Sequence, residues 1–172
     1  MMLSHLQFST PRLDVAALSS GSETSGNLAK EFAALLTPAV KQHLPPDIQS
    51  VNDAQSAAVW LQQALTESTF LAVTERDSQS LAGFILLYAE TNTDGLLDLR
   101  LGYVVSEEQQ GKGLASEMLQ GLVSWCQQSG KVATLSGGAE ENNLASIRVL
   151  EKNGFVRDGE ALKGTVFLTR TF

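Results

Sequence analysis

A glycine-containing turn joins two strongly patterned segments in the second half of the chain, and it constrains the fold more than any other feature. Before it, residues 96–105 alternate between apolar and other side chains, as in a strand with one buried face. The alternating residues are Leu97, Leu99, Leu101, Tyr103 and Val105. After the turn, apolar residues from Leu114 to Cys126 recur at the helical period, and Gly130 ends the pattern. We therefore predict a strand, the turn EEQQGKG (107–113) and an amphipathic helix in direct succession.

This turn has the properties of an anion site. The first main-chain N–H groups of a helix have no partner within the helix, and the helix dipole is positive there. Gly111 and Gly113 allow positive φ angles and a close approach of a phosphate to the main chain. The alternative is a turn that only starts the helix, and the turn alone leaves both open. The motifs GxxxxGK(S/T) and GxGxxG are both absent.

The remaining segments predict a mixed α/β (α+β) domain over residues 1–172, with the element order βααβββαβαββ. The polar segment 19–26 is expected to be a mobile loop or the approach to a helix. Asp53 is a candidate helix N-cap, and Asn142 and Asn143 are candidates for a later helix. The predicted elements are a first strand over 6–18 interrupted by Pro11, helices over 28–44 (broken or kinked at Pro38) and 53–66, a hairpin of strands over 69–76 and 80–90, a short strand over 131–136, a helix over about 144–152, and two closing strands within 155–172.

Charge and composition argue against several classes of function. The chain has 12 basic and 19 acidic residues and a net charge of −7, which opposes binding to nucleic acid and suits a cationic partner such as an amine. No stretch approaches the roughly 20 apolar residues of a membrane helix. The N-terminus, MMLSHLQFSTPRL, lacks the pattern of a secretory signal. We therefore expect a cytoplasmic protein that binds neither nucleic acid nor a membrane.

Cysteine and histidine are scarce. Cys126 is the single cysteine, so no internal disulfide can form, and its place on the apolar helical stripe indicates a core residue. His5 and His43 are the two histidines. We predict no structural zinc site and no metal cofactor.

Two motifs in register carry a resemblance to a known superfamily. Residues 110–115 (QGKGLA) match the pattern (Q/R)xxGx(G/A), which resembles the acyl-CoA pyrophosphate loop of the GNAT superfamily of N-acetyltransferases. Residues 141–160 resemble its second block, in which an asparagine, here Asn143, opens a short helix that a Gly-Phe pair follows. The segments STPRL (9–13) and LGYVV (101–105) are similar to the Rim-like branch, whose best-known members acetylate ribosomal-protein N-termini. The resemblance covers nearly the whole chain.

The resemblance implies a mostly antiparallel central sheet with helices on both faces, and a binding site for acetyl-CoA. The strand 96–105 would splay from the strand 131–136 and receive the pantetheine arm. Asn143 would contact the pantetheine end, and Lys112 would either contact a phosphate or remain a solvated lysine. Main-chain groups of Tyr103, Val104 and Val105 would pair with pantetheine, and the pyrophosphate would be held by N–H groups of Gln110, Gly111, Lys112, Gly113, Leu114, Ala115 and Ser116.

The activity implied is direct transfer of an acetyl group from acetyl-CoA to a primary amine, either a protein N-terminus or a small molecule. Ser146 lies where this branch has a group near the thioester, although it could also be a plain helix-face serine. The sequence departs from the family at Leu150, where many members have a tyrosine acid, and at Arg100, where many Rim-like members have a glutamate. Asp98 is the preferred replacement base, and it could instead be a surface acid or a salt-bridge partner.

Four questions stay open from the sequence. Glu90 is a second candidate for the base. The two departures from the family pattern leave a rival function, a non-catalytic acyl-CoA-binding sensor or regulatory module. The sequence also leaves the amine acceptor open and allows either a monomer or a homodimer.

Overall fold

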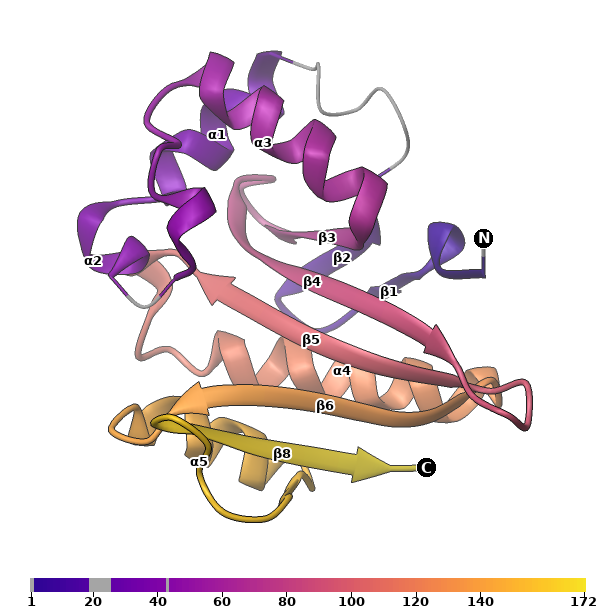
Figure 1. The fold of residues 1–172 in the computed structure, drawn as a ribbon. Coiled ribbons are helices and arrows are strands. Elements are labelled where there is room, and N and C mark those ends of the chain that lie inside the picture. Colours follow the sequence, from indigo (N-terminus) through magenta and orange to yellow (C-terminus); the bar gives the residue numbers. More distant parts are fainter. Residues whose placement is uncertain (1, 19–25, 43) are drawn as a thin grey trace.

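The computed structural model describes residues 2–18, 26–42 and 44–172. Within these ranges, eight strands form one sheet in the order β1-β2-β3-β4-β5-β6-β8-β7 (Figure 1). Among these strands, β5 and β6 pair in parallel, and every other neighbouring pair is antiparallel. The strands are β1 (Gln7–Ser9), β2 (Leu13–Ala17), β3 (Thr69–Glu75), β4 (Leu81–Thr91), β5 (Leu97–Val105), β6 (Val132–Glu140), β7 (Val156–Arg157) and β8 (Thr165–Thr171).

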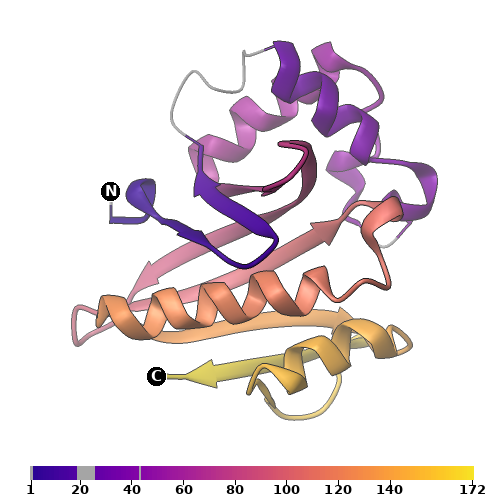
Figure 2. The same ribbon diagram turned by 180° about the vertical axis from the view of Figure 1, so that it is seen from behind.

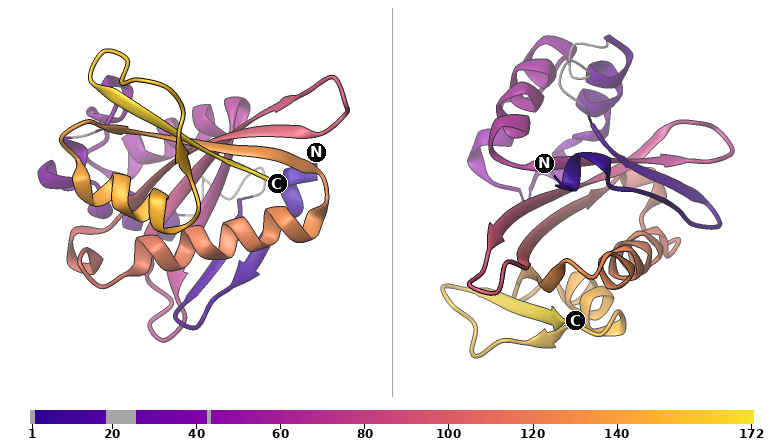
Figure 3. Two further views of the ribbon diagram at one scale, coloured as in Figure 1. Left: turned by 90° about the horizontal axis from the view of Figure 1, so that it is seen from below. Right: turned by 90° about the vertical axis from the view of Figure 1, so that its right-hand side faces the viewer.

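Helices connect these strands and confirm the predicted mixed fold. The helices are η1 (Met2–His5), α1 (Gly26–Leu35), α2 (Pro38–Lys41), η3 (Pro46–Ile48), α3 (Ala54–Glu67), η4 (Glu107–Gln109), α4 (Leu114–Ser129) and α5 (Leu144–Lys152). Helices α1–α3 lie on one side of the sheet, and α4 and α5 lie on the other (Figure 3). Within the described ranges, no helix is long and apolar enough to cross a lipid bilayer.

Three predicted segments differ in detail from the observed ones. Pro11 lies at the turn of a β1–β2 hairpin, so the segment 6–18 forms two antiparallel strands. The predicted break near Pro38 is confirmed, since α1 ends at Leu35 and α2 begins at Pro38, but α2 ends at Lys41 and not at the predicted residue 44. Thr37 caps α2 by accepting a hydrogen bond from the Val40 N–H. Strand β6 runs four residues beyond its predicted end at 136. The polar segment 19–26, expected to be a mobile loop or the approach to a helix, lies outside the described residues except for Gly26.

Two apolar cores anchor the sheet to its helices. On the α4 and α5 side, Leu99 and Leu101 of β5 pack with Met118, Leu122 and other buried residues of α4 and α5. The opposite core, under α1 and α3, is built around Phe32, Phe70 and Phe84. The rings of Phe70 and Phe84 stack with centroids 5.1 Å apart. Strand β5 therefore contributes one face to each core.

The β1–β2 hairpin lies against α4, although more than 100 residues separate them in sequence (Figure 2). A side chain at Gly121 of α4 would collide with the ring of Phe8 in β1. The glycine therefore permits the close contact between the helix and the hairpin. This contact brings the hairpin turn to the N-terminal end of α4.

Candidate active site

Strands β5 and β6 separate along part of their length. They pair in parallel register from Leu97 opposite Val132 to Leu101 opposite Gly137. Beyond these residues, β5 continues to Val105 beside β4, and β6 continues to Glu140 beside β8. Figure 1 shows the two strands diverging toward their carboxyl ends. We call this region, residues 102–105 of β5 and 138–140 of β6, the splay.

Main-chain groups of β5 face the splay. The Leu97 N–H donates to the carbonyl of Lys131 at 2.8 Å, so the main-chain groups of every second residue from Leu97 point toward β6. Tyr103 and Val105 belong to this set, but β6 has diverged at their positions. The Val105 carbonyl accepts a hydrogen bond from Nε2 of Gln110 at 3.1 Å. The N–H groups of both residues and the Tyr103 carbonyl form an open edge, to which an extended chain can bond.

Val104 is oriented differently. The Ser106 N–H donates to the carbonyl of Ala82 at 2.8 Å, so the even-numbered residues of β5 direct their main-chain groups toward β4. Val104 lies opposite Phe84 in this register, and its side chain is buried in the aromatic core. Among the three residues predicted to pair with pantetheine, the geometry therefore favours Tyr103 and Val105.

The glycine turn opens onto the start of α4. Gly111 and Gly113 have φ angles of +79° and +80°, and Gly113 is the N-cap of the helix. Among the described residues, none accepts a well-aligned hydrogen bond from the main-chain N–H groups of residues 111–116. The side chain of Leu114 is buried and that of Lys112 is exposed. This loop has unused donors at a helix start, as an anion site requires.

A hydroxyl pair joins β5 to α5 at the splay. Asn143 caps α5 by accepting a hydrogen bond from the Ser146 N–H at 3.2 Å. The Ser146 hydroxyl lies 2.7 Å from the phenol oxygen of Tyr103. Burial raises the pKa of Tyr103 above its ordinary value of 10.0, and the hydrogen bond with Ser146 offsets this in part. The phenol is therefore protonated at neutral pH and can donate to Ser146, which leaves the serine hydrogen for another acceptor.

The structure places the two family positions that differ in this sequence and the two candidate bases. Leu150 is 1% exposed and belongs to the core, so it supplies no acid. Arg100 is exposed on the face of β5 that α4 does not cover. Asp98 accepts a hydrogen bond from the Thr134 hydroxyl at 2.8 Å, in the part of β5 still paired with β6. Glu90 lies opposite Asp98 on β4.

Asp98 is distant from the hydroxyl pair. It precedes Tyr103 by five residues along β5, which corresponds to roughly 16 Å at about 3.3 Å per residue. The structure thus gathers the loop, Tyr103, Asn143 and Ser146 around the splay and leaves both candidate bases near its closed end.

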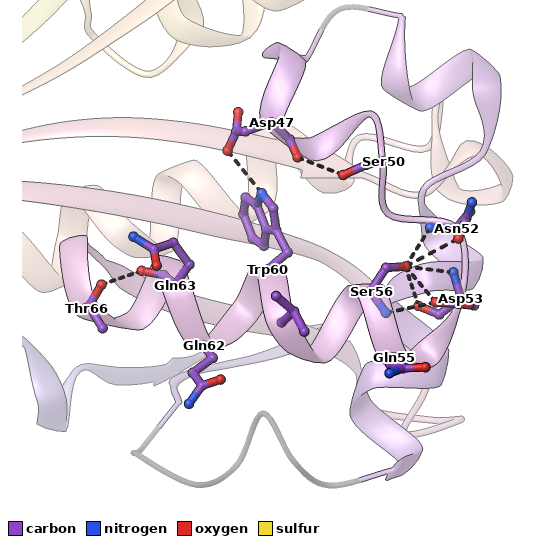
Figure 4. Close-up of a pocket in the computed structure, with 11 residues that line it drawn as sticks. Asp47, Ser50, Asn52, Asp53, Gln55, Ser56, Trp60, Gln62, Gln63 and Thr66 are labelled. Carbon is purple, nitrogen blue, oxygen red and sulfur yellow. Dashed lines mark hydrogen bonds between the residues drawn. The ribbon is translucent and has the colours of Figure 1, made fainter.

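Two surface depressions lie elsewhere. One of about 770 Å³ lies along the outer face of α3, where Trp60 Nε1 donates to Asp47 at 3.0 Å and Asp53 accepts from Ser56 (Figure 4). The other, of about 520 Å³, lies between the β1–β2 hairpin and α4. Neither is lined by residues of the splay. Across the residues that the structure describes, no cluster of three or more His, Cys, Asp or Glu could hold a metal ion.

Comparison with known proteins identifies the fold and the family. The profile of the acetyltransferase (GNAT) domain matches residues 26–156. This chain belongs to the GNAT acetyltransferase family. The ribosomal-protein-serine acetyltransferase of Escherichia coli (strain K12) is 26% identical over 134 residues, which cover 66% of this chain and 74% of that protein. The resemblance noted in the sequence is thereby confirmed, and the chain is an acetyltransferase of the GNAT type.

Solved GNAT structures share the fold at low identity. The ribosomal-protein-S5-alanine acetyltransferase from Vibrio fischeri has a TM-score of 0.79 at 17% identity, covering 96% of this chain and 96% of that one. A ribosomal L7/L12 alpha-N-protein acetyltransferase in complex with coenzyme A has a TM-score of 0.76 at 17% identity, covering 97% of this chain and 98% of that one. These likenesses show a common fold.

Two side chains at the site were not predicted from the sequence. The phenol of Tyr103 meets Ser146, which is 43 residues away in sequence. Arg12 meets Glu117 in the first turn of α4 across 105 residues. Tyr103 was predicted for its main chain only, and the segment containing Arg12 was noted only as a family resemblance. A local pattern carries no information about such distant partners.

Proposed function

We propose that this protein transfers an acetyl group from acetyl-CoA to a primary amine, either a protein N-terminus or a small molecule. The observation that carries the proposal is the splay between β5 and β6 next to a loop of unused main-chain donors. The family membership supports the same chemistry.

The residues present fit acetyl-CoA. Donors from Gly111 to Ser116 would bind the diphosphate, and the exposed side chain of Lys112 could add a charge contact. The open edge at Tyr103 and Val105 would bond the amides of the pantetheine arm. Asn143 would lie at the far end of that arm. When bound, acetyl-CoA would supply an acetyl thioester at the hydroxyl pair.

Direct transfer requires two proton movements. The amine nitrogen forms a bond to the acetyl carbon while the carbon–sulfur bond breaks, and sulfur keeps the electron pair. One proton must leave the amine, and one must reach the sulfur. The Ser146 hydroxyl would donate to the sulfur, and the Tyr103 phenol would orient it.

The group that receives the amine proton stays a prediction. Asp98 and Glu90 would act through ordered water molecules, because the paired part of the sheet separates them from the hydroxyl pair. If Asp98 has this role, Asp98→Asn will lower kcat and shift the acid limb of its pH profile, with CoA affinity unchanged. An unchanged profile for Asp98→Asn and Glu90→Gln would remove both residues from the mechanism.

The acceptor can approach from the face of the sheet that α4 and α5 do not cover. Gly102 lies on that face where the splay begins, and no atom lies within 4 Å of a side chain built there. A protein N-terminus is supported by the names of the relatives, which include ribosomal-protein acetyltransferases. The cytoplasmic location and the choice between monomer and homodimer stay predictions of the sequence.

Two measurements test the function. Titration calorimetry with acetyl-CoA measures binding, and release of the CoA thiol measures turnover with a panel of peptides with free N-termini, polyamines and aminoglycosides. We expect binding, with thiol release for one class of amine. Binding without release on any amine would favour the sensor module, and absence of binding would refute the cofactor site.

A further inference from the structure

We propose that Arg12 is a positioning residue that holds the diphosphate loop in the conformation that presents its N–H groups to the ligand. The inference rests on the proposed function, and it concerns a residue outside the loop itself. Arg12 belongs to the turn of the β1–β2 hairpin, and Figure 2 shows this hairpin lying against α4.

Arg12 makes two different contacts through its guanidinium group. Its Nε donates to Oε1 of Glu117 at 2.7 Å, and its Nη1 donates to the main-chain carbonyl of Lys112 at 2.9 Å. The main-chain N–H of Arg12 donates to Oε2 of Glu117 at 2.9 Å, and the Thr10 hydroxyl donates to the same oxygen. The hairpin turn is thus tied both to the first turn of α4 and to the loop before it.

The bond to Lys112 fixes the direction of a donor. In a trans peptide unit the carbonyl and the following N–H point in opposite directions. Because the Lys112 carbonyl points toward Arg12, the Gly113 N–H must point away from the hairpin. Gly113 tolerates positive and negative φ angles equally, so the loop sequence alone does not fix this peptide unit. Arg12 supplies the missing constraint.

The bonds to Glu117 keep its carboxylate from competing with an anionic ligand for the unused N–H groups. A carboxylate in the first turn of a helix can itself accept hydrogen bonds from unused N–H groups and would oppose an anionic ligand. Burial favours a higher pKa for Glu117, but hydrogen bonds from Thr10 and Arg12 outweigh it and hold the pKa below its ordinary value. The ionised carboxylate is therefore engaged by the hairpin, and the N–H groups of residues 111–116 stay available.

Arg76 offers a matched control. Its Nη1 donates to the carbonyl of Thr10 at 3.1 Å, so it contacts the same hairpin turn. Its side chain is 51% exposed, compared with 49% for Arg12. Its side chain contacts the Thr10 carbonyl and Asp14, its main chain bonds to the Arg12 carbonyl and the Gln79 side chain, and none of these contacts reaches the loop. Arg76→Gln therefore removes the same charge near the hairpin without touching the loop.

The experiment compares a ligand that has the diphosphate with one that lacks it. Dissociation constants for CoA are measured by titration calorimetry, and those for pantetheine by amide chemical shifts. The proteins are the wild type, Arg12→Lys, Arg12→Gln and Arg76→Gln. We expect both Arg12 variants to weaken CoA binding about tenfold or more, since lysine cannot span two acceptors with a fixed fork. Pantetheine affinity and the Arg76→Gln variant should be unchanged.

Three outcomes would overturn the inference. Unchanged CoA affinity in Arg12→Lys and Arg12→Gln would show that the loop conformation does not depend on Arg12. An equal loss for CoA and pantetheine would indicate a general structural role, and an equal loss in Arg76→Gln would indicate a charge effect alone. Failure of the wild type to bind CoA is a distinct result, since it would refute the proposed function before the variants are compared.

Discussion

Replacing Gly111 by alanine tests the diphosphate loop directly. Gly111 has a φ angle of +79°, and no atom lies within 4 Å of a side chain built there. The methyl group therefore meets no clash in the free protein, and the cost is backbone strain alone. A left-handed conformation costs a residue other than glycine roughly 1–2 kcal/mol. In a chain of this length each kcal/mol corresponds to about 2–4 °C in Tm.

The other end of the same helix provides the control. Gly130 caps the C-terminus of α4 with a φ angle of +66°, and a side chain there would also meet nothing within 4 Å. Gly130→Ala should therefore lower Tm by a similar amount. Only Gly111→Ala should affect the ligand, because its methyl group projects from the loop and relief of its strain would redirect neighbouring N–H groups. Losing one hydrogen bond to an anionic oxygen costs about 1.5–3 kcal/mol, which corresponds to about ten- to hundredfold weaker CoA binding.

The assay pairs thermal unfolding without ligand with titration calorimetry of CoA. We expect Gly111→Ala and Gly130→Ala to lower Tm by similar amounts, and only Gly111→Ala to weaken CoA binding. If Gly111→Ala binds CoA like the wild type, or if Gly130→Ala weakens binding equally, the assignment of this loop to the diphosphate is refuted.

Three further predictions follow from the site and its surroundings. Ser146→Ala should lower the rate of acetyl transfer about a hundredfold with unchanged CoA affinity, and Tyr103→Phe should lower it less; thiol-release kinetics measure both. The folded-state pKa of Glu117 lies below its ordinary value of 4.5, so its ionised form stabilises the fold above that pH, and the contribution is lost as the pH falls through the lowered pKa. The difference in urea unfolding free energy between the wild type and Glu117→Gln should therefore shrink below pH 4.5. Burial raises the pKa of Cys126 to about 12, so a thiol reagent at pH near 8 should label it only after unfolding.

Elements with a strong local pattern were predicted well from the sequence. The stripe from Leu114 to Cys126 forms α4, which ends at Ser129 with Gly130 as its C-cap. Asp53 caps α3 as predicted, since its side chain accepts a hydrogen bond from the Ser56 N–H at 2.8 Å. These features depend on a few neighbouring residues, so the local sequence is enough to predict them.

Features that depend on distant partners were predicted less well. Strand β6 extends to Glu140 because β8 pairs with it along Gly137–Glu140. The two glycines in this segment interrupt the local strand pattern, so the sequence predicted an earlier end. Asp98 is the preferred base from the sequence because it shares a strand face with Arg100, but hydrogen bonding to Thr134 and the strand register set its surroundings. Pairing of this kind follows from tertiary contacts that local periodicity does not encode.

The sequence by itself determined the order of the elements from β3 onward, the family and the position of the glycine loop, because periodicity, caps and glycine conformations act over a few residues. Tertiary structure decided where β5 and β6 part, which main-chain groups of β5 border the gap, and which side chains meet there. Tyr103 reaches Ser146 and Arg12 reaches the loop only after the sheet is assembled. The physical reason is that each hydrogen bond needs both partners within about 3 Å, and for residues far apart in sequence the fold alone sets that distance.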